Sequence, residues 1–485
     1  MNIIATSMSQ LKDSTIKGVQ WSAIERFTVQ GINFLVQIVL ARLLCPEDYG
    51  IIGMLAIFMQ VAQVLIDSGF ASALIQKQKC TEEDYSTVFY FSLAISAFLY
   101  FCLFISSPLV ARFYDMPILA HVTKVISITL ILNALPIIHR TKLVKIVDFK
   151  TQSKVSLASA VLSGFLGIVL AYKGAGVWAL CVQQISNSAL QAVLLFYFVK
   201  WFPSGNFSKR SFNNLFGFGS KLLLSSLLNS IYRNLYTFVI GKTFSARSLG
   251  CYTRAEQFAM FPSSNLANII SRVAYPIFSK IQEDSEQLSS VYRKMIRFSS
   301  LIIFPLMFGL IAVSDPFIIT ILTEKWRGVI ILLQILCLDW SLDHITALNL
   351  NLLYVKGRSD LALRLEIIKK TIAVIILFAS IPFGLECMCW GRVLYSVIAT
   401  YANTYYTKRL IGLSLWRQLS DIYPYFVNSA IMAFGVYLLQ SHISNPILSL
   451  LVSLSMGVVI YILLIYTTCN SIFKECIELI KNKIK

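Results

Sequence analysis

Charged residues are scarce in this chain: Asp, Glu, Lys and Arg make up 14% of the 485 residues, whereas hydrophobic residues make up 56%. Soluble domains carry about a quarter of charged residues, so this composition excludes a soluble globular protein. The apolar residues fall in stretches of about twenty, the length that an α-helix needs to cross a bilayer. The sequence therefore predicts an all-α polytopic membrane protein.

Motifs for several kinds of chemistry are also missing. The sequence has no G-x-x-x-x-G-K-[ST] loop for nucleotide phosphates, no HExxH and no Ser–His–Asp pattern. Its ten Cys are scattered, and Cys387 and Cys389 form a CxC without a second pair or a His partner. We therefore expect no enzyme activity, no metal and no cofactor.

Hydropathy divides the chain into fourteen predicted spans. They fall near residues 16–42, 49–75, 85–107, 120–140, 154–173, 177–200, 213–241, 251–275, 293–314, 329–355, 361–383, 386–407, 421–441 and 446–468. We assign spans 1–6 to an N-terminal lobe (1–205) and spans 7–12 to a C-terminal lobe (206–412). Spans 13 and 14 with a basic tail occupy 413–485.

An internal similarity supports the division into two lobes. Val39–Gly50 and Val239–Gly250 lie roughly two hundred residues apart, and in both a long apolar segment ends at a cation and resumes at Gly. Transporters built from such repeats place their substrate site between the related halves. We therefore predict two pseudo-symmetric six-helix lobes around a central cavity, followed by two C-terminal helices.

The net charge of +18 would suggest nucleic acid as the partner of a soluble protein. Here Lys and Arg instead concentrate in alternate loops by about three to one, as the positive-inside rule requires. This pattern predicts cytoplasmic N- and C-termini and no nucleic-acid partner. No predicted loop exceeds roughly twenty residues, which leaves no room for a folded domain outside the membrane.

Polar side chains recur every three or four residues in several spans, which places them on one helix face. These stripes are Ser22, Arg26, Gln30, Asn33 and Gln37; Gln60, Gln63 and Asp67; Gln184, Asn187 and Gln191; Ser226, Asn229, Arg233 and Thr237; and Asn265, Asn268 and Arg272. Lipid cannot satisfy such groups, so they bond to other helices or line a water-filled cavity. Three arginines among them favour the cavity.

The arginines suggest what the cavity binds. Arg26, Arg233 and Arg272 would attract phosphate, because the guanidinium donates paired hydrogen bonds. Snorkelling or structural pairing is the alternative for each. The remaining predicted substrate-binding residues are Asn33, Gln37, Asn229 and Asn268.

Three carboxylates are candidates for ion or proton coupling: Asp67, Asp339 and Asp343. Asp339 and Asp343 are four residues apart and would share a helix face next to His344. A proton relay is one interpretation of this pair. A polar patch packed against a neighbouring helix is the other, and the pattern favours it.

Several segments resemble a known family. They are Gly18–Ser22, Val39–Gly50, Asp67–Gln76, Pro262–Phe278, Lys280–Gln282, Thr323–Trp326 and Leu348–Lys370. From about residue 12 to 410 the chain is similar to polysaccharide flippases of the multidrug/oligosaccharidyl-lipid/polysaccharide exporter superfamily. The resemblance is strongest to the Wzx-like branch that exports lipopolysaccharide O-antigen and colanic-acid units.

The resemblance implies a fourteen-helix, two-lobed protein of the bacterial inner membrane that alternates between inward- and outward-facing states. Its substrate would be an undecaprenyl-pyrophosphate-linked oligosaccharide, and polysaccharide polymerases and glycosyltransferases would be its partners. The last two helices would accommodate the lipid tail. The Asp339–Asp343 pair matches no pattern of the family.

We therefore predict a flippase for surface polysaccharide such as O-antigen, capsule or exopolysaccharide. A cation-coupled multidrug exporter of the same fold is the nearest alternative, although such a cavity should be dominated by carboxylates rather than by arginine. A membrane-embedded glycan polymerase or ligase is the alternative from another class, and it would need a larger periplasmic loop. A scaffold would leave the polar stripes without a role beyond packing.

Overall fold

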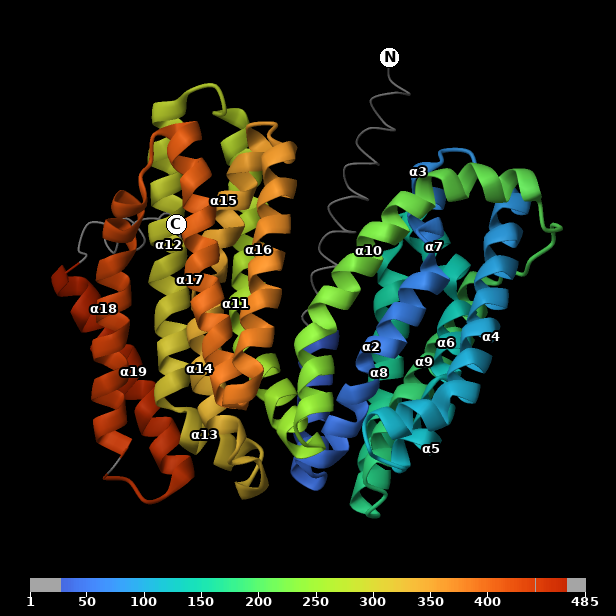
Figure 1. Ribbon diagram of the computed structural model, residues 1–485, viewed down its shortest axis with the longest axis horizontal. Helices are drawn as coiled ribbons and strands as arrows, with labels where there is room; N and C mark the ends of the chain where they lie inside the picture. The colour runs from blue at the N-terminus through green and yellow to red at the C-terminus, as the bar shows by residue number, and fades with distance from the viewer. Residues whose placement is uncertain (1–27, 441, 469–485) are drawn as a thin grey trace. The chain divides into compact units, whose positions relative to one another are not determined.

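The computed structural model describes residues 28–440 and 442–468, which are helical almost throughout (Figure 1). A helix over Thr28–Leu43 comes first. It is followed by α2 (Pro46–Asp67), α3 (Phe70–Gln76), α4 (Glu82–Phe113), α5 (Ile118–Ile126), α6 (Ile128–Ala134), α7 (Ile137–Lys145), α8 (Phe149–Tyr172), α9 (Val177–Val199) and α10 (Lys209–Thr243). The rest are α11 (Ala246–Lys280), α12 (Ser285–Ala312), α13 (Ser314–Ile321), α14 (Val329–Ser341), α15 (Asp343–Val355), α16 (Ser359–Ser380), α17 (Leu385–Ile411), α18 (Leu415–Gln440) and α19 (Pro446–Thr468).

The all-helical membrane fold is confirmed. In the described part of the chain, nine helical stretches are long and apolar enough to cross a membrane, some of them built from successive helices such as α14 and α15. All fourteen predicted spans overlap a helical segment. The long helices α10, α11, α16 and α17 are not among the nine, so fourteen crossings stay a prediction.

The chain divides into two compact units that meet between Gly250 and Cys251. In the first, α8 packs along α9, and α10 packs against α2, α3 and α4. The contacts of α10 place it in this unit, whereas the sequence places the lobe boundary near residue 205. The assignment of α10 to a duplicated second lobe stays a prediction about the repeat.

Three helices of the first unit, α4, α8 and α10, begin at side-chain caps. Thr81 accepts a hydrogen bond from the amide of Asp84, whose carboxylate accepts one from the Thr81 amide, which is a capping box. Asp148 and Ser208 cap α8 and α10 by accepting from the amides of Thr151 and Ser211, without the reciprocal bond. Buried Phe70, Leu74, Val88, Ile138 and Trp201 belong to one hydrophobic cluster of this unit.

In the second unit, α12 packs along α18, α17 packs against α14 and α16, and α18 against α19. The aromatic residues Tyr252, Phe278, Tyr292, Phe304 and Trp326 are among its largest fully buried side chains. Asp284 caps α12 by accepting from two backbone amides.

The two similar turns of the sequence lie against each other. A Cβ built on Gly50 would lie 1.8 Å from the carbonyl oxygen of Ala246, and a Cβ on Gly250 would lie 1.8 Å from that of Pro46. The contacts are reciprocal, because Pro46 and Gly50 hold the places in the first turn that Ala246 and Gly250 hold in the second. Only glycine permits so close a crossing of two backbones.

Candidate functional site

A polar cavity of about 790 Å³ lies within the first unit. Helices α2, α3, α6, α7, α9 and α10 contribute its walls. Its polar side chains are Gln63, Asp67, Ser72, Thr129, Asn133, Arg140, Thr141, Gln184, Asn187, Ser188, Gln191 and Ser226. The cavity thus contains the whole predicted stripe of the sixth span, Gln63 and Asp67 from that of the second span, and Ser226 alone from that of the seventh span.

A break in the second span positions Asp67. Helix α2 ends at this residue, and Ser68 and Gly69 take left-handed backbone conformations with φ of 43° and 70°. Gly69 also touches α10, because a Cβ there would lie 2.5 Å from the carbonyl oxygen of Gly219. Glycine suits both the positive φ and the close approach, and the last residue of α2 consequently faces the cavity.

Hydrogen bonds between side chains connect part of the cavity wall, including Gln63 of α2. Arg140 Nη2 donates to Gln191 Oε1 at 2.6 Å, and Gln191 Nε2 donates to Asn187 Oδ1 at 3.4 Å. Asn133 Nδ2 donates to Gln63 Oε1 at 3.5 Å. Amide side chains both donate and accept, so this wall matches ligands that do the same, such as the hydroxyl groups of sugars.

The cavity holds one charge of each sign. The Arg140 guanidinium and the Asp67 carboxylate both line it, and the two groups attract each other electrostatically. Charges in a partly dehydrated cavity interact more strongly than they do in water. A protonated Asp67 would therefore leave Arg140 more available to an anionic ligand.

The other predicted residues of the first unit that the structure describes lie outside this cavity. Asn33 and Gln37 are on the first helix, exposed and half-buried respectively. Asn229 and Arg233 are on α10, and both are exposed. Arg26 lies outside the described residues.

In the second unit, Asn268 and Arg272 are exposed on α11, and Asn268 Nδ2 donates to the Ser264 carbonyl at 2.7 Å. The shared face of Asp339 and Asp343 stays a prediction, because the predicted span breaks between them. Helix α14 ends at Ser341 and α15 begins at Asp343, so the two carboxylates are on different helices and the spacing rule for one helix does not apply.

Asp339 instead belongs to a buried network around Arg392 of α17. Arg392 Nε donates to Asp339 Oδ2 at 2.9 Å, and Nη1 donates to Glu256 Oε1 at 2.8 Å and to Tyr252 Oη at 2.6 Å. Ser396 Oγ also donates to Asp339. A guanidinium between two carboxylates links α11, α14 and α17, and this pairing supports a packing role for Asp339; its role in coupling stays a prediction.

Two arginines in these sites were missed from the sequence. Arg140 is the last residue of the predicted fourth span, where hydropathy gives way to charge, and it belongs to none of the predicted polar stripes. Its position seven residues after Asn133 is the helical spacing that indicates a shared side of the chain. Arg392 lies inside the predicted twelfth span, and an intramembrane arginine should itself have indicated a partner.

The fold is that of a solved membrane transporter. The chain superposes on a structure described as the lipid II flippase MurJ in an inward closed conformation, with a TM-score of 0.77 and 14% sequence identity. The superposition covers 94% of this chain and 100% of the other. Together with its membrane-length helices, this likeness shows a multi-pass membrane protein of that fold.

Residues 39–331 match the family model described as polysaccharide biosynthesis protein. The chain belongs to this family, which confirms the resemblance found in its sequence. The teichuronic acid biosynthesis protein TuaB of Bacillus subtilis (strain 168) is 28% identical over 94% of this chain and 96% of its own length. The lipopolysaccharide biosynthesis protein WzxC of Escherichia coli (strain K12) is 28% identical over 86% of each.

Proposed function

We propose that this protein is a flippase that moves an undecaprenyl-pyrophosphate-linked oligosaccharide across the bacterial inner membrane by alternating access. The observation that carries the proposal is the polar cavity of the first unit, in a chain of the polysaccharide biosynthesis family. The similarity of this chain to TuaB and WzxC supports a pathway that ends in a surface polysaccharide. A flippase fold supports a lipid-linked substrate.

The cavity suits part of such a substrate. Gln63, Asn133, Asn187 and Gln191 offer amides that can bond to sugar hydroxyls. Arg140 offers a guanidinium to a phosphate or to an acidic sugar. We infer that this wall holds the headgroup, and that Arg26, Arg233 and Arg272 contribute further positive charge where the pyrophosphate passes.

Complementation tests the proposal. In a bacterial strain that lacks its own flippase for a matching glycan, the wild-type protein should restore surface polysaccharide. Arg140→Ala should reduce the restored amount by at least about tenfold, since a charge-assisted hydrogen bond contributes roughly 1.5–3 kcal/mol. Arg26→Ala, Arg233→Ala and Arg272→Ala test the other cations at the same membrane level.

Arg112→Ala is the matched control, because Arg112 is an exposed arginine of the same unit and lies outside the cavity. Flipping of the native lipid in proteoliposomes then separates transport from assembly defects. Full polysaccharide from Arg140→Ala would remove this cavity from the substrate path. Export of cationic drugs without lipid flipping would favour a multidrug exporter instead.

A further inference from the structure

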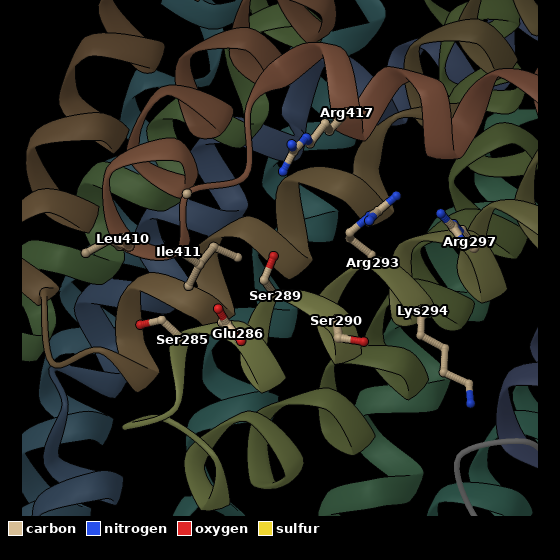
Figure 2. A pocket seen from close by; sticks show the side chains of 11 residues that line it. Ser285, Glu286, Ser289, Ser290, Arg293, Lys294, Arg297, Leu410, Ile411 and Arg417 are labelled. Carbon is tan, nitrogen blue, oxygen red and sulfur yellow. The ribbon is translucent and has the colours of Figure 1, made fainter.

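A second polar pocket, of about 790 Å³, lies within the second unit (Figure 2). The N-terminal half of α12 provides Arg293, Lys294 and Arg297, and the first turn of α18 provides Arg417. The hydroxyls of Ser289 and Ser290 are also in its lining, as is the carboxylate of Glu286. Cations thus outnumber carboxylates at this end of the unit.

A buried carboxylate beside the pocket fixes two of these arginines. Arg293 Nε and Nη2 donate to Asp421 Oδ2 and Oδ1 at 2.7 and 2.9 Å, and Arg297 Nε donates to Asp421 Oδ1 at 2.7 Å. The Asp421 side chain is only 2% exposed, whereas those of Arg293 and Arg297 are 39% and 35% exposed. One carboxylate therefore orients two guanidiniums without neutralising both.

Arg417 adds a third guanidinium. Its side chain is exposed, and no residue in 28–440 or 442–468 forms a hydrogen bond or ion pair with that guanidinium. Two arginines oriented by a buried carboxylate and a third, exposed arginine leave an excess of positive charge in the pocket. Guanidinium groups match the oxygens of phosphate in geometry and charge, so the pocket is chemically suited to a phosphate group.

An apolar groove of about 930 Å³ lies on the same segments of chain. Ile411 and Gly412 line the basic pocket, while Leu415, Trp416 and Leu419 line the groove. The groove runs along α17 and α18, and its exposed aromatic residues are Tyr401, Trp416, Tyr423 and Phe426. A basic pocket next to an apolar groove with interfacial aromatics fits an amphiphile rather than a free anion.

We propose that the second unit binds an anionic phospholipid, with its phosphate between Arg293, Arg297 and Arg417 and an acyl chain in the groove between α17 and α18. This site is separate from the polar cavity of the first unit, and it does not depend on the flippase assignment. It would make the stability of the second unit sensitive to the anionic lipid content of the membrane.

Thermal unfolding of the purified, delipidated full-length protein in detergent tests the proposal. Phosphatidylglycerol should raise Tm in a concentration-dependent way, because a ligand that binds only the folded state stabilises it. Phosphatidylcholine with the same acyl chains should have no such effect, and neither should inorganic pyrophosphate. Arg417→Gln should weaken phosphatidylglycerol binding by about tenfold, the loss expected for one charge-assisted contact.

Arg364→Gln is the matched control, because Arg364 is exposed in the same unit and lies outside both pockets. Trp416→Ala should also weaken binding of phosphatidylglycerol, through the groove alone. The unliganded Tm of each variant shows whether it is folded, and Arg417→Lys, which keeps the charge, should bind with intermediate affinity. Equal responses to both lipids, an equal response to pyrophosphate, or unchanged binding by Arg417→Gln would each overturn the proposal.

Discussion

At the scale of single residues, Asp67 stands out because its carboxylate shares a cavity with a cation. We expect Asp67→Asn, which keeps the shape of the side chain and removes its charge, to abolish the dependence of flipping on a proton gradient. In that variant no proton can bind at position 67, so a change of pH no longer changes the charge that faces Arg140. Lipid flipping in proteoliposomes, measured with and without an imposed pH gradient, checks this.

Glu83→Gln serves as the control, since Glu83 is exposed in the same unit and outside the cavity. If Asp67→Asn flips lipid at the wild-type rate and keeps the same gradient dependence, Asp67 does not couple transport to protons.

The sequence identified Asp67 and the amide stripes because helical spacing is a local property. It missed Arg140 because hydropathy ends a span where charge begins, whereas α7 continues as a helix to Lys145. The same short helix carries Lys145, whose Nζ donates to the carbonyls of Leu74 and Lys77. Neighbouring cations can therefore serve the cavity or the fold, and only tertiary contacts distinguish them.

At the scale of elements, the crossing of the two similar turns gives a sharp test. Gly50→Ala or Gly250→Ala would place a Cβ 1.8 Å from a backbone carbonyl oxygen, so the helices must move apart. We expect each variant to lose at least about 1–3 kcal/mol of unfolding free energy, the usual cost of overpacking. Thermal unfolding of the purified variants measures the loss.

Gly217→Ala on α10 is the comparison, because nothing lies within 4 Å of a Cβ at that position. Alanine favours a helix over glycine by about 0.5–1 kcal/mol, so this variant should be slightly more stable than wild type. A Gly50→Ala protein as stable as wild type would mean that the two turns do not cross as closely as described.

Hydropathy does not predict where a helix breaks within a span. Hydropathy runs through residues 329–355 without interruption, yet α14 and α15 are separate helices there. The break lies between Asp339, which pairs with Arg392 of α17, and Asp343. The pairing joins residues far apart in the sequence, so no local pattern predicts the pairing. The break after Asp67 was easier to anticipate, because Gly69 follows it.

At the scale of the whole molecule, hydropathy located the helices and the family resemblance indicated their common fold. The compact units divide at Gly250 because α10 packs on α2, α3 and α4, which is a tertiary property, and the boundary near residue 205 stays a prediction about the repeat. Hydropathy also does not decide how many helices cross the membrane. The number of crossings must be tested at α10, α11, α16 and α17. These four helices are long, but they are too polar to be recognised as membrane spans.

The connection between α16 and α17 discriminates between the two topologies. Helix α16 has 22 residues, and at about 1.5 Å per residue it is long enough to span a hydrocarbon core of about 30 Å. If it crosses, residues 381–384 lie on the periplasmic side and residues 356–358 on the cytoplasmic side. We therefore expect a truncation after Phe383 fused to alkaline phosphatase to be active, and one after Arg358 to be inactive. Fusions of green fluorescent protein at the same two positions should give the reverse pattern. Fluorescence at Phe383 would show that α16 does not cross, and the fourteen-span topology would then be wrong.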